Sequence, residues 1–194
     1  MWSLANEPDT FRKESRKYFK TLVDVMKNLD KSRPVTIVLN AASSQDVAGD
    51  LIDVICVNRY YGWYSDHGHV ESINGSLTND IVSWRQKYKK PVILSEYGAD
   101  TIEGMSTEPS MTFSVQYQVE LLYKTHESID FLKKRKDLAG EMVWNFADFM
   151  TAQSLTRVIG NHKGVLTRNR QPKMAAYLLK ERYARIVGES KRIL

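Results

Sequence analysis

Short apolar runs rich in β-branched residues alternate with longer amphipathic stretches along the whole chain of 194 residues. This alternation predicts βα units around a parallel sheet, because two parallel strands need a crossover connection that is usually a helix. We expect strands at residues 1–6, 35–40, 52–60, 92–96 and 140–145. We expect helices at residues 14–29, 77–88, 113–136 and 173–187, with a short turn near residues 45–49. The predicted fold class is therefore α/β.

Local patterns add two expectations about the core. In the first expected helix, Leu22, Val25, Met26 and Leu29 recur at three- and four-residue spacing, which is typical of a stripe that faces the core. The single cysteine, Cys56, lies inside an apolar run, so we expect a buried strand residue rather than a reactive thiol.

Polar or aromatic residues follow each expected strand, at the point where the strand ends. Chemistry at the carboxyl ends of parallel strands is typical of the (β/α)₈ barrel, which has eight strands and about 250 residues. Only five strands are expected here, so we predict that residues 1–194 supply roughly the carboxyl-terminal half of a TIM barrel, about strands 4 to 8. The first expected strand begins abruptly at Met1, which predicts that three more strands lie upstream.

Composition excludes several classes of function. The formal net charge is +5, but the Lys and Arg residues are interleaved with acidic residues, which disfavours a nucleic-acid partner. The chain has no apolar stretch near the roughly 18 residues of a membrane span. A single cysteine cannot form a disulfide framework. His67 and His69 lack an evident set of further ligands, so we expect neither a metal nor a cofactor.

Two glutamates are the strongest candidates for catalysis. Glu7 directly follows the first expected strand and precedes Pro8, which favours an extended turn at that point. Glu96 closes a strand that should be buried. Two carboxylates at the ends of different parallel strands can face one another across a barrel mouth. Glycoside hydrolysis by double displacement requires such a pair.

Four blocks of sequence closely resemble the β-glucuronidases of glycoside hydrolase family 2. They are residues 1–8, 58–64, 95–100 and 143–149, and they occur in the same order along the chain. The resemblance implies a TIM-barrel catalytic domain that follows upstream β-sandwich domains, and a retaining hydrolase that cleaves β-D-glucuronides. It also implies a homo-oligomer that acts on glucuronides or on glycans containing glucuronic acid.

The resemblance assigns roles to individual residues. Glu7 matches the catalytic acid/base and Glu96 the nucleophile, while Asn6 matches the residue that hydrogen-bonds the sugar 2-hydroxyl. Tyr60 matches a catalytic-site tyrosine that contacts the nucleophile. A retaining mechanism needs one protonated and one ionised carboxyl group about 5 to 5.5 Å apart, which agrees with these roles.

Further residues match the part of the family site that binds the sugar. Tyr64 and Trp144 match aromatic residues that line the sugar pocket, since an aromatic plane suits the apolar face of a pyranose. Asn161 and Lys163 match an Asn-x-Lys pair that binds the glucuronate carboxylate, and Arg157 matches a further nearby cation. Relatives that act on neutral sugars have no use for such a pair, so it is the most discriminating feature of the chain.

Two alternatives remain open from the sequence. One is another family 2 retaining glycosidase, such as a β-galacturonidase or a β-galactosidase-like enzyme. The other is a catalytically inert fragment, because a barrel that lacks its early strands has unpaired edges, and we expect the isolated chain to be inactive. Similar enzymes occur in animal lysosomes and bacterial cytoplasm. Residues 144–150 and 168–173 resemble the animal type and favour the lysosome.

Overall fold

A computed structural model describes residues 1–190 of the chain, which form two compact units. Unit 1 comprises Met1–Arg59, Asn74–Tyr97 and Glu127–Met142. Unit 2 comprises Tyr60–Ile73, Gly98–His126 and the segment from Val143 onward.

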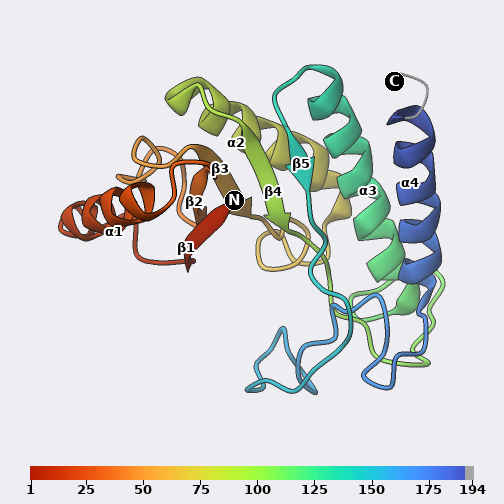
Figure 1. Cartoon of the computed structure of the whole chain (residues 1–194). Helices are drawn as coiled ribbons and strands as arrows, with labels where there is room; N and C mark the ends of the chain where they lie inside the picture. Colours follow the sequence, from red (N-terminus) through yellow and green to blue (C-terminus); the bar gives the residue numbers. More distant parts are fainter. Residues whose placement is uncertain (191–194) are drawn as a thin grey trace. The chain divides into compact units, whose positions relative to one another are not determined.

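Unit 1 contains a sheet of five parallel strands in the order β1-β2-β3-β4-β5 (Figure 1). The strands are β1 (Trp2–Asn6), β2 (Val35–Leu39), β3 (Val54–Asn58), β4 (Val92–Glu96) and β5 (Gly140–Glu141). Each strand pairs with the next one along the chain, as in one sector of a barrel wall. The predicted α/β fold with five parallel strands is therefore confirmed.

The central strands are buried on both faces, as is usual for a parallel sheet covered by helices. Val35, Ile37 and Leu39 of β2 are fully buried, and the intervening Thr36 is 1% exposed. The Thr36 hydroxyl donates to the carbonyl oxygen of Val54 (2.7 Å), which satisfies this polar group inside the core. Cys56 is also buried, as predicted, and burial raises the pKa of its thiol.

Among residues 1–190, four α-helices connect or follow the strands. They are α1 (Ser15–Leu29), α2 (Ile73–Tyr88), α3 (Val115–Lys134) and α4 (Met174–Ser190), with a short 3₁₀ helix, η1 (Val70–Ser72), before α2. No helix in the described part of the chain is long and apolar enough to cross a membrane.

The predicted core stripe of α1 was partly wrong. Val25 is 50% exposed and Leu29 is 76% exposed, whereas Phe19 and Val23 are the buried residues of the helix. The buried face is rotated toward Phe19, because the aromatic side chain contributes more apolar area than either exposed residue. Spacing alone identified an amphipathic helix and misplaced the centre of its apolar face.

Two of the expected strands are shorter in the structure. The run at residues 52–60 forms a strand only over Val54–Asn58, and Ile52 is a buried turn residue. The run at 140–145 forms a strand only over Gly140–Glu141. Just beyond it, the Met142 backbone N–H donates to the Leu94 carbonyl oxygen of β4 (2.8 Å).

The helix expected from residue 77 begins at Ile73. Asn74 therefore lies in a helix, where its carboxamide oxygen accepts from Thr78 (3.3 Å) and Ser128 (3.4 Å).

Unit 2 has its own small core of aromatic and aliphatic side chains. Its buried members are Trp63, Ile73, Ala99, Tyr117 and Leu121. The Tyr117 hydroxyl donates to the Gly62 carbonyl oxygen, and burial raises the pKa of Tyr117 to about 12. This core holds the segment after β3 in place, including the tyrosines that follow it in the sequence.

Candidate active site

The carboxyl ends of the unit 1 strands present the first group of candidate residues. Asn6 ends β1 and Glu96 ends β4, as predicted. Glu7 directly follows β1, and its backbone N–H donates to the Val38 carbonyl oxygen (2.8 Å). Its φ of 48° is in the left-handed region, which is uncommon for a residue other than glycine and is found at functional sites. Glu7 is exposed and Glu96 is partly buried.

Asn58, at the end of β3, lies next to both glutamates. Its Nδ2 donates to Glu7 Oε1 (2.8 Å), and its Oδ1 accepts from Ser95 Oγ (2.8 Å). In the sheet register Asn58 is also the partner of Glu96. Because Ser95 fixes the carboxamide oxygen, the amide N–H is directed at Glu7. Glu7 and Glu96 therefore flank the same buried asparagine.

Arg59, which follows β3, anchors the same strand ends. Its side chain is 8% exposed and forms an ion pair with Asp80 of α2. It also donates to the carbonyl oxygens of Leu39 at the end of β2 (3.3 Å) and of Ala41 just after it (2.7 Å), while its backbone N–H donates to the Glu96 carbonyl oxygen (2.9 Å). A guanidinium with this many acceptors immobilises the backbone that carries Asn58 and Glu96.

Neither Asn58 nor Arg59 was proposed from the sequence as a functional residue. Asn58 carried a usable signal, because it is a polar residue at the carboxyl end of a buried strand. Arg59 carried a weaker one, because its ion-pair partner is on a different element and sequence spacing does not reveal the pair.

In unit 2, Lys163 is a fully buried cation. Its Nζ is bonded to Asp100 Oδ1 (2.5 Å) and donates to the Tyr64 hydroxyl (2.9 Å). The ammonium lies 4.6 Å from the ring centre of Tyr64, 5.2 Å from Trp63 and 5.6 Å from Tyr60, within the range of cation–π attraction. We call these five residues, Tyr60, Trp63, Tyr64, Asp100 and Lys163, the lysine cage.

Tyr64 links the cage to a second cation. Its hydroxyl accepts from Arg157 Nε (3.3 Å) as well as from Lys163. The hydrogen bond to Tyr64 raises the pKa of Arg157, and the nearby Asp100 carboxylate acts in the same direction. Tyr64 itself is 45% exposed. Two of the predicted carboxylate-binding cations therefore converge on the exposed phenol that was predicted to line the sugar pocket.

The segment that carries Asn161 and Lys163 is held by its own hydrogen bonds. Asn161 is buried, and its Oδ1 accepts from the Lys163 backbone N–H (3.2 Å). Its backbone forms an antiparallel bridge with Phe149, with both N–H groups donating across the bridge (2.9 and 3.1 Å). From α3, the buried Gln118 carboxamide donates to the carbonyl oxygens of Lys163 (3.4 Å) and Gly164 (3.2 Å).

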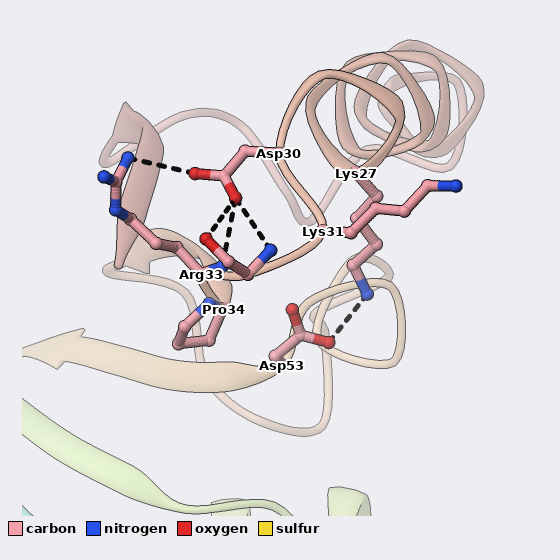
Figure 2. A pocket seen from close by; sticks show the side chains of 7 residues that line it. Lys27, Asp30, Lys31, Arg33, Pro34 and Asp53 are labelled. Atoms are coloured by element: carbon pink, nitrogen blue, oxygen red, sulfur yellow. Dashed lines mark hydrogen bonds and ion pairs between the residues drawn. The ribbon is translucent and has the colours of Figure 1, made fainter.

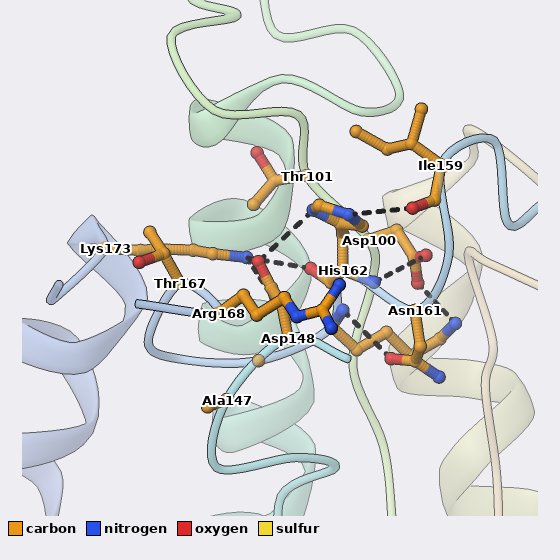
Figure 3. Close-up of polar contacts among 12 residues, drawn as sticks. Asp100, Thr101, Ala147, Asp148, Ile159, Asn161, His162, Thr167, Arg168 and Lys173 are labelled. Carbon is orange, nitrogen blue, oxygen red and sulfur yellow. Dashed lines mark hydrogen bonds and ion pairs between the residues drawn. The ribbon is translucent and has the colours of Figure 1, made fainter. Parts of the chain in front are cut away.

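A buried ion pair supports the same segment at His162. Figure 3 shows Lys173 and the His162 ring directed at the Asp148 carboxylate, with Lys173 Nζ 2.7 Å from Asp148 Oδ2 and His162 Nδ1 3.2 Å from it. Lys173 also donates to the His162 carbonyl oxygen (3.0 Å). Burial raises the pKa of Asp148 and lowers that of Lys173, while their mutual attraction opposes both shifts. The sequence did not single out Asp100, Asp148 or Lys173.

Trp144 is partly buried and lies edge-on to Phe149, with ring centres 6.3 Å apart. Its carbonyl oxygen approaches Gly98 so closely that a Cβ added to Gly98 would lie 2.6 Å from it. Gly98 has a φ of 149°, so glycine is favoured there by both backbone conformation and space.

A pocket of about 340 Å³ lies at the other ends of the unit 1 strands (Figure 2). It is lined by Lys27, Asp30, Lys31, Ser32, Arg33, Pro34 and Asp53. Ion pairs join Lys27 to Asp53 (2.6 Å) and Arg33 to Asp30 (3.0 Å). Catalytic groups of such sheets gather at the carboxyl ends of strands, so we assign this pocket a structural role. Among residues 1–190 no group of three or more His, Cys, Asp or Glu side chains is placed to hold a metal ion.

Comparison with known proteins places this site in a family. The model of "Glycosyl hydrolases family 2, TIM barrel domain" matches residues 1–187. The chain belongs to glycosyl hydrolase family 2. The resemblance drawn from the four sequence blocks is thereby confirmed, and so is the TIM-barrel class of the fold.

Relatives within family 2 are similar over almost the whole chain. Beta-glucuronidase of Canis lupus familiaris is 51% identical over 98% of the chain, and that of Homo sapiens is 49% identical over the same share. The solved beta-D-glucuronidase of Dictyoglomus thermophilum is 47% identical over 95% of the chain, with a TM-score of 0.90. The chain spans 29% of the two mammalian relatives and 31% of the Dictyoglomus chain.

Proposed function

We propose that the protein containing this chain hydrolyses β-D-glucuronides by double displacement with retention of anomeric configuration. The observation that carries the proposal is the pair Glu7 and Glu96, which stand at the ends of different parallel strands and flank the same asparagine. Membership of family 2 supports this assignment, because a strand-end carboxylate pair is what retaining glycosidases use.

Glu7 acts as the acid/base and Glu96 as the nucleophile. In the first step a Glu96 oxygen bonds to the anomeric carbon while Glu7 gives its proton to the departing aglycone oxygen. In the second step Glu7 takes a proton from water, whose oxygen attacks the anomeric carbon and displaces the Glu96 carboxylate. Asn6 hydrogen-bonds the sugar 2-hydroxyl, and the family resemblance assigns Tyr60 to the catalytic site. Trp144 contacts the apolar face of the sugar.

Selectivity for a uronic acid comes from the cations of unit 2. Lys163 and Arg157 provide charge, Asn161 shapes the segment that carries Lys163, and Tyr64 is the phenol on which both cations converge. A charge-assisted hydrogen bond from lysine to a partly desolvated carboxylate contributes roughly 1.5 to 3 kcal/mol. A neutral hexoside gains nothing from this charge, which disfavours a β-galactosidase-like activity.

The names of similar proteins favour the same substrate class. Eight curated mammalian relatives and the solved bacterial structures carry the name beta-glucuronidase. One solved neighbour, from Ruminococcus gnavus, was determined in complex with D-glucuronic acid, and it is 38% identical with a TM-score of 0.85. Lysosomal location and homo-oligomerisation stay predictions.

Covalent trapping tests the proposal in the complete gene product that contains this chain. After exposure to a 2-deoxy-2-fluoro aryl β-glucuronide, mass spectrometry should locate the sugar on Glu96. Glu96→Gln should abolish labelling, whereas Glu7→Ala should still be labelled when the leaving group is very good. Label on another residue would overturn the assignment. Faster turnover of an aryl β-galacturonide or β-galactoside would overturn the substrate class instead.

A further inference from the structure

Both carboxylate oxygens of Asp100 accept hydrogen bonds from the segment that carries Lys163. Oδ1 bonds the Lys163 ammonium (2.5 Å), and Oδ2 accepts from the backbone N–H of His162, the residue before Lys163 (3.0 Å). Asp100 is 1% exposed, and the Lys163 side chain is fully buried. One carboxylate therefore fixes both the tip of the lysine and the backbone from which it extends.

We propose that Asp100 is a positioning residue for recognition of the sugar carboxylate: it holds the Lys163 ammonium in place and balances its charge until the substrate is bound. This inference rests on the proposed function, because it gives Lys163 the uronic acid as ligand. Asp100 acts through Lys163 and through the loop backbone, and it touches neither the anomeric carbon nor the aglycone in this mechanism.

Charge balance is the first argument for this role. A buried ammonium without a counterion is strongly unfavourable, and the three aromatic rings of the lysine cage offer weaker stabilisation than a carboxylate. Lys163 and Arg157 contribute two positive charges and Asp100 contributes one negative charge, so the group carries a net charge of +1. That value matches the single negative charge of a uronic acid.

Hydrogen-bond geometry is the second argument. An ammonium has three N–H donors. Among the described residues, Asp100 and the Tyr64 hydroxyl accept two of these donors. In this proposal the third donor serves the sugar carboxylate, and its direction is fixed once the other two donors are bound. Asp100 thereby sets where a sugar carboxylate must lie, as well as how strongly it is attracted.

A second buried aspartate provides a matched control. Asp148 pairs with Lys173 (2.7 Å) and lies 3.2 Å from the His162 ring, so it supports the same segment from the other side. Its charged partners are Lys173 and His162. Removing the charge of Asp148 should loosen the segment in general, whereas removing that of Asp100 should act specifically through Lys163.

A double-mutant cycle tests the inference in the complete gene product. The variants are Asp100→Asn, Lys163→Met and the double variant, with Asp148→Asn as control. Asparagine keeps an oxygen that can accept from the His162 N–H, and methionine fits an aromatic cage without a charge. Asp100→Asn should lower kcat/KM for an aryl β-glucuronide at least about tenfold, mainly by raising KM. In the Lys163→Met background the same change should lower it less than about threefold.

Thermal unfolding of the wild-type protein and the same four variants provides a readout that does not depend on activity. Asp100→Asn leaves a buried cation unpaired and should lower Tm by at least about 3 °C, while the double variant should be more stable than Asp100→Asn. If the wild-type protein does not turn over glucuronides, the proposed function fails, but this comparison still shows whether Asp100 holds Lys163. Independent, additive effects of the two substitutions on Tm and kcat/KM would overturn the inference. The inference would also be overturned if Asp100→Asn and Asp148→Asn changed KM and kcat to the same extent.

Discussion

The bridge formed by Asn58 leads to the most direct prediction about catalysis. Asn58→Ala removes the N–H donor from Glu7 Oε1 and leaves Ser95 Oγ without its acceptor. A hydrogen bond to a charged group contributes roughly 1.5 to 3 kcal/mol. Since 1.36 kcal/mol corresponds to about tenfold in rate, kcat/KM should fall by about 10- to 150-fold.

The assay compares two aryl β-glucuronides that differ in leaving group. If Asn58 orients Glu7 as the acid, the loss should be large for a poor leaving group and small for a dinitrophenyl group, which needs little protonation. Ser95→Ala serves as a graded control. It removes a neutral hydrogen bond of about 0.5 to 1.5 kcal/mol and should cost about 2- to 12-fold.

Asn74→Ala is the matched control for loss of an asparagine. Its carboxamide oxygen accepts from the hydroxyls of Thr78 on α2 and Ser128 on α3. It should change stability slightly and kcat/KM by less than about threefold. The reasoning would be refuted if Asn58→Ala lost less than about threefold. It would also be refuted if Ser95→Ala lowered kcat/KM more than Asn58→Ala, because the hydrogen bond from Asn58 to Glu7 would then not account for the loss.

Three further changes follow from the structure. Lys163→Ala should lower kcat/KM for an aryl β-glucuronide at least about tenfold and leave kcat/KM for an aryl β-glucoside nearly unchanged, because only the uronic acid uses the charge. Equal losses of kcat/KM on both substrates would assign Lys163 a purely structural role. Gly164→Ala should strongly reduce the yield of folded protein, measured by circular dichroism, since an added Cβ would overlap the Asp148 backbone nitrogen; normal folding would contradict that packing. In an ultraviolet titration, one tyrosine should ionise near pH 12 and be missing in Tyr117→Phe, because burial raises its pKa to about 12. The folded-state pKa of Tyr117 exceeds the unfolded value of about 10, so its contribution to stability should be present below pH 10 and lost as pH rises through 12. The argument would be contradicted if the free energy of unfolding of the wild-type protein and that of Tyr117→Phe differed by the same amount throughout this pH range.

The sequence by itself determined the elements of the fold with good accuracy. The strand at Val92–Glu96 was predicted with its observed bounds, and α1 begins one residue after its predicted start. These features are local, because β-branched runs and helical spacing are encoded within a few neighbouring residues. The same locality brought Glu7 and Glu96 to notice, since each directly follows or closes an apolar run.

Errors appeared where burial depended on elements distant in the sequence. Val25 and Leu29 of α1 fit a helical stripe but are exposed, because spacing defines an apolar face only approximately. The run at residues 140–145 was too long as a strand, since pairing with β4 ends after Met142. Alternation of residue types cannot show where a neighbouring strand stops.

Only the tertiary structure decided which side chains meet. Asp100 and Lys163 are 63 positions apart, and Tyr64 and Lys163 are 99 apart, yet both pairs are hydrogen-bonded in the lysine cage. The partner of Glu7 was likewise set by the register of β3, which carries Asn58 to the end of β1. The sequence named the chemical groups because residue type is local information. The tertiary fold determines which of these groups pair, because a buried charge is stable only where distant segments bring it a counterion.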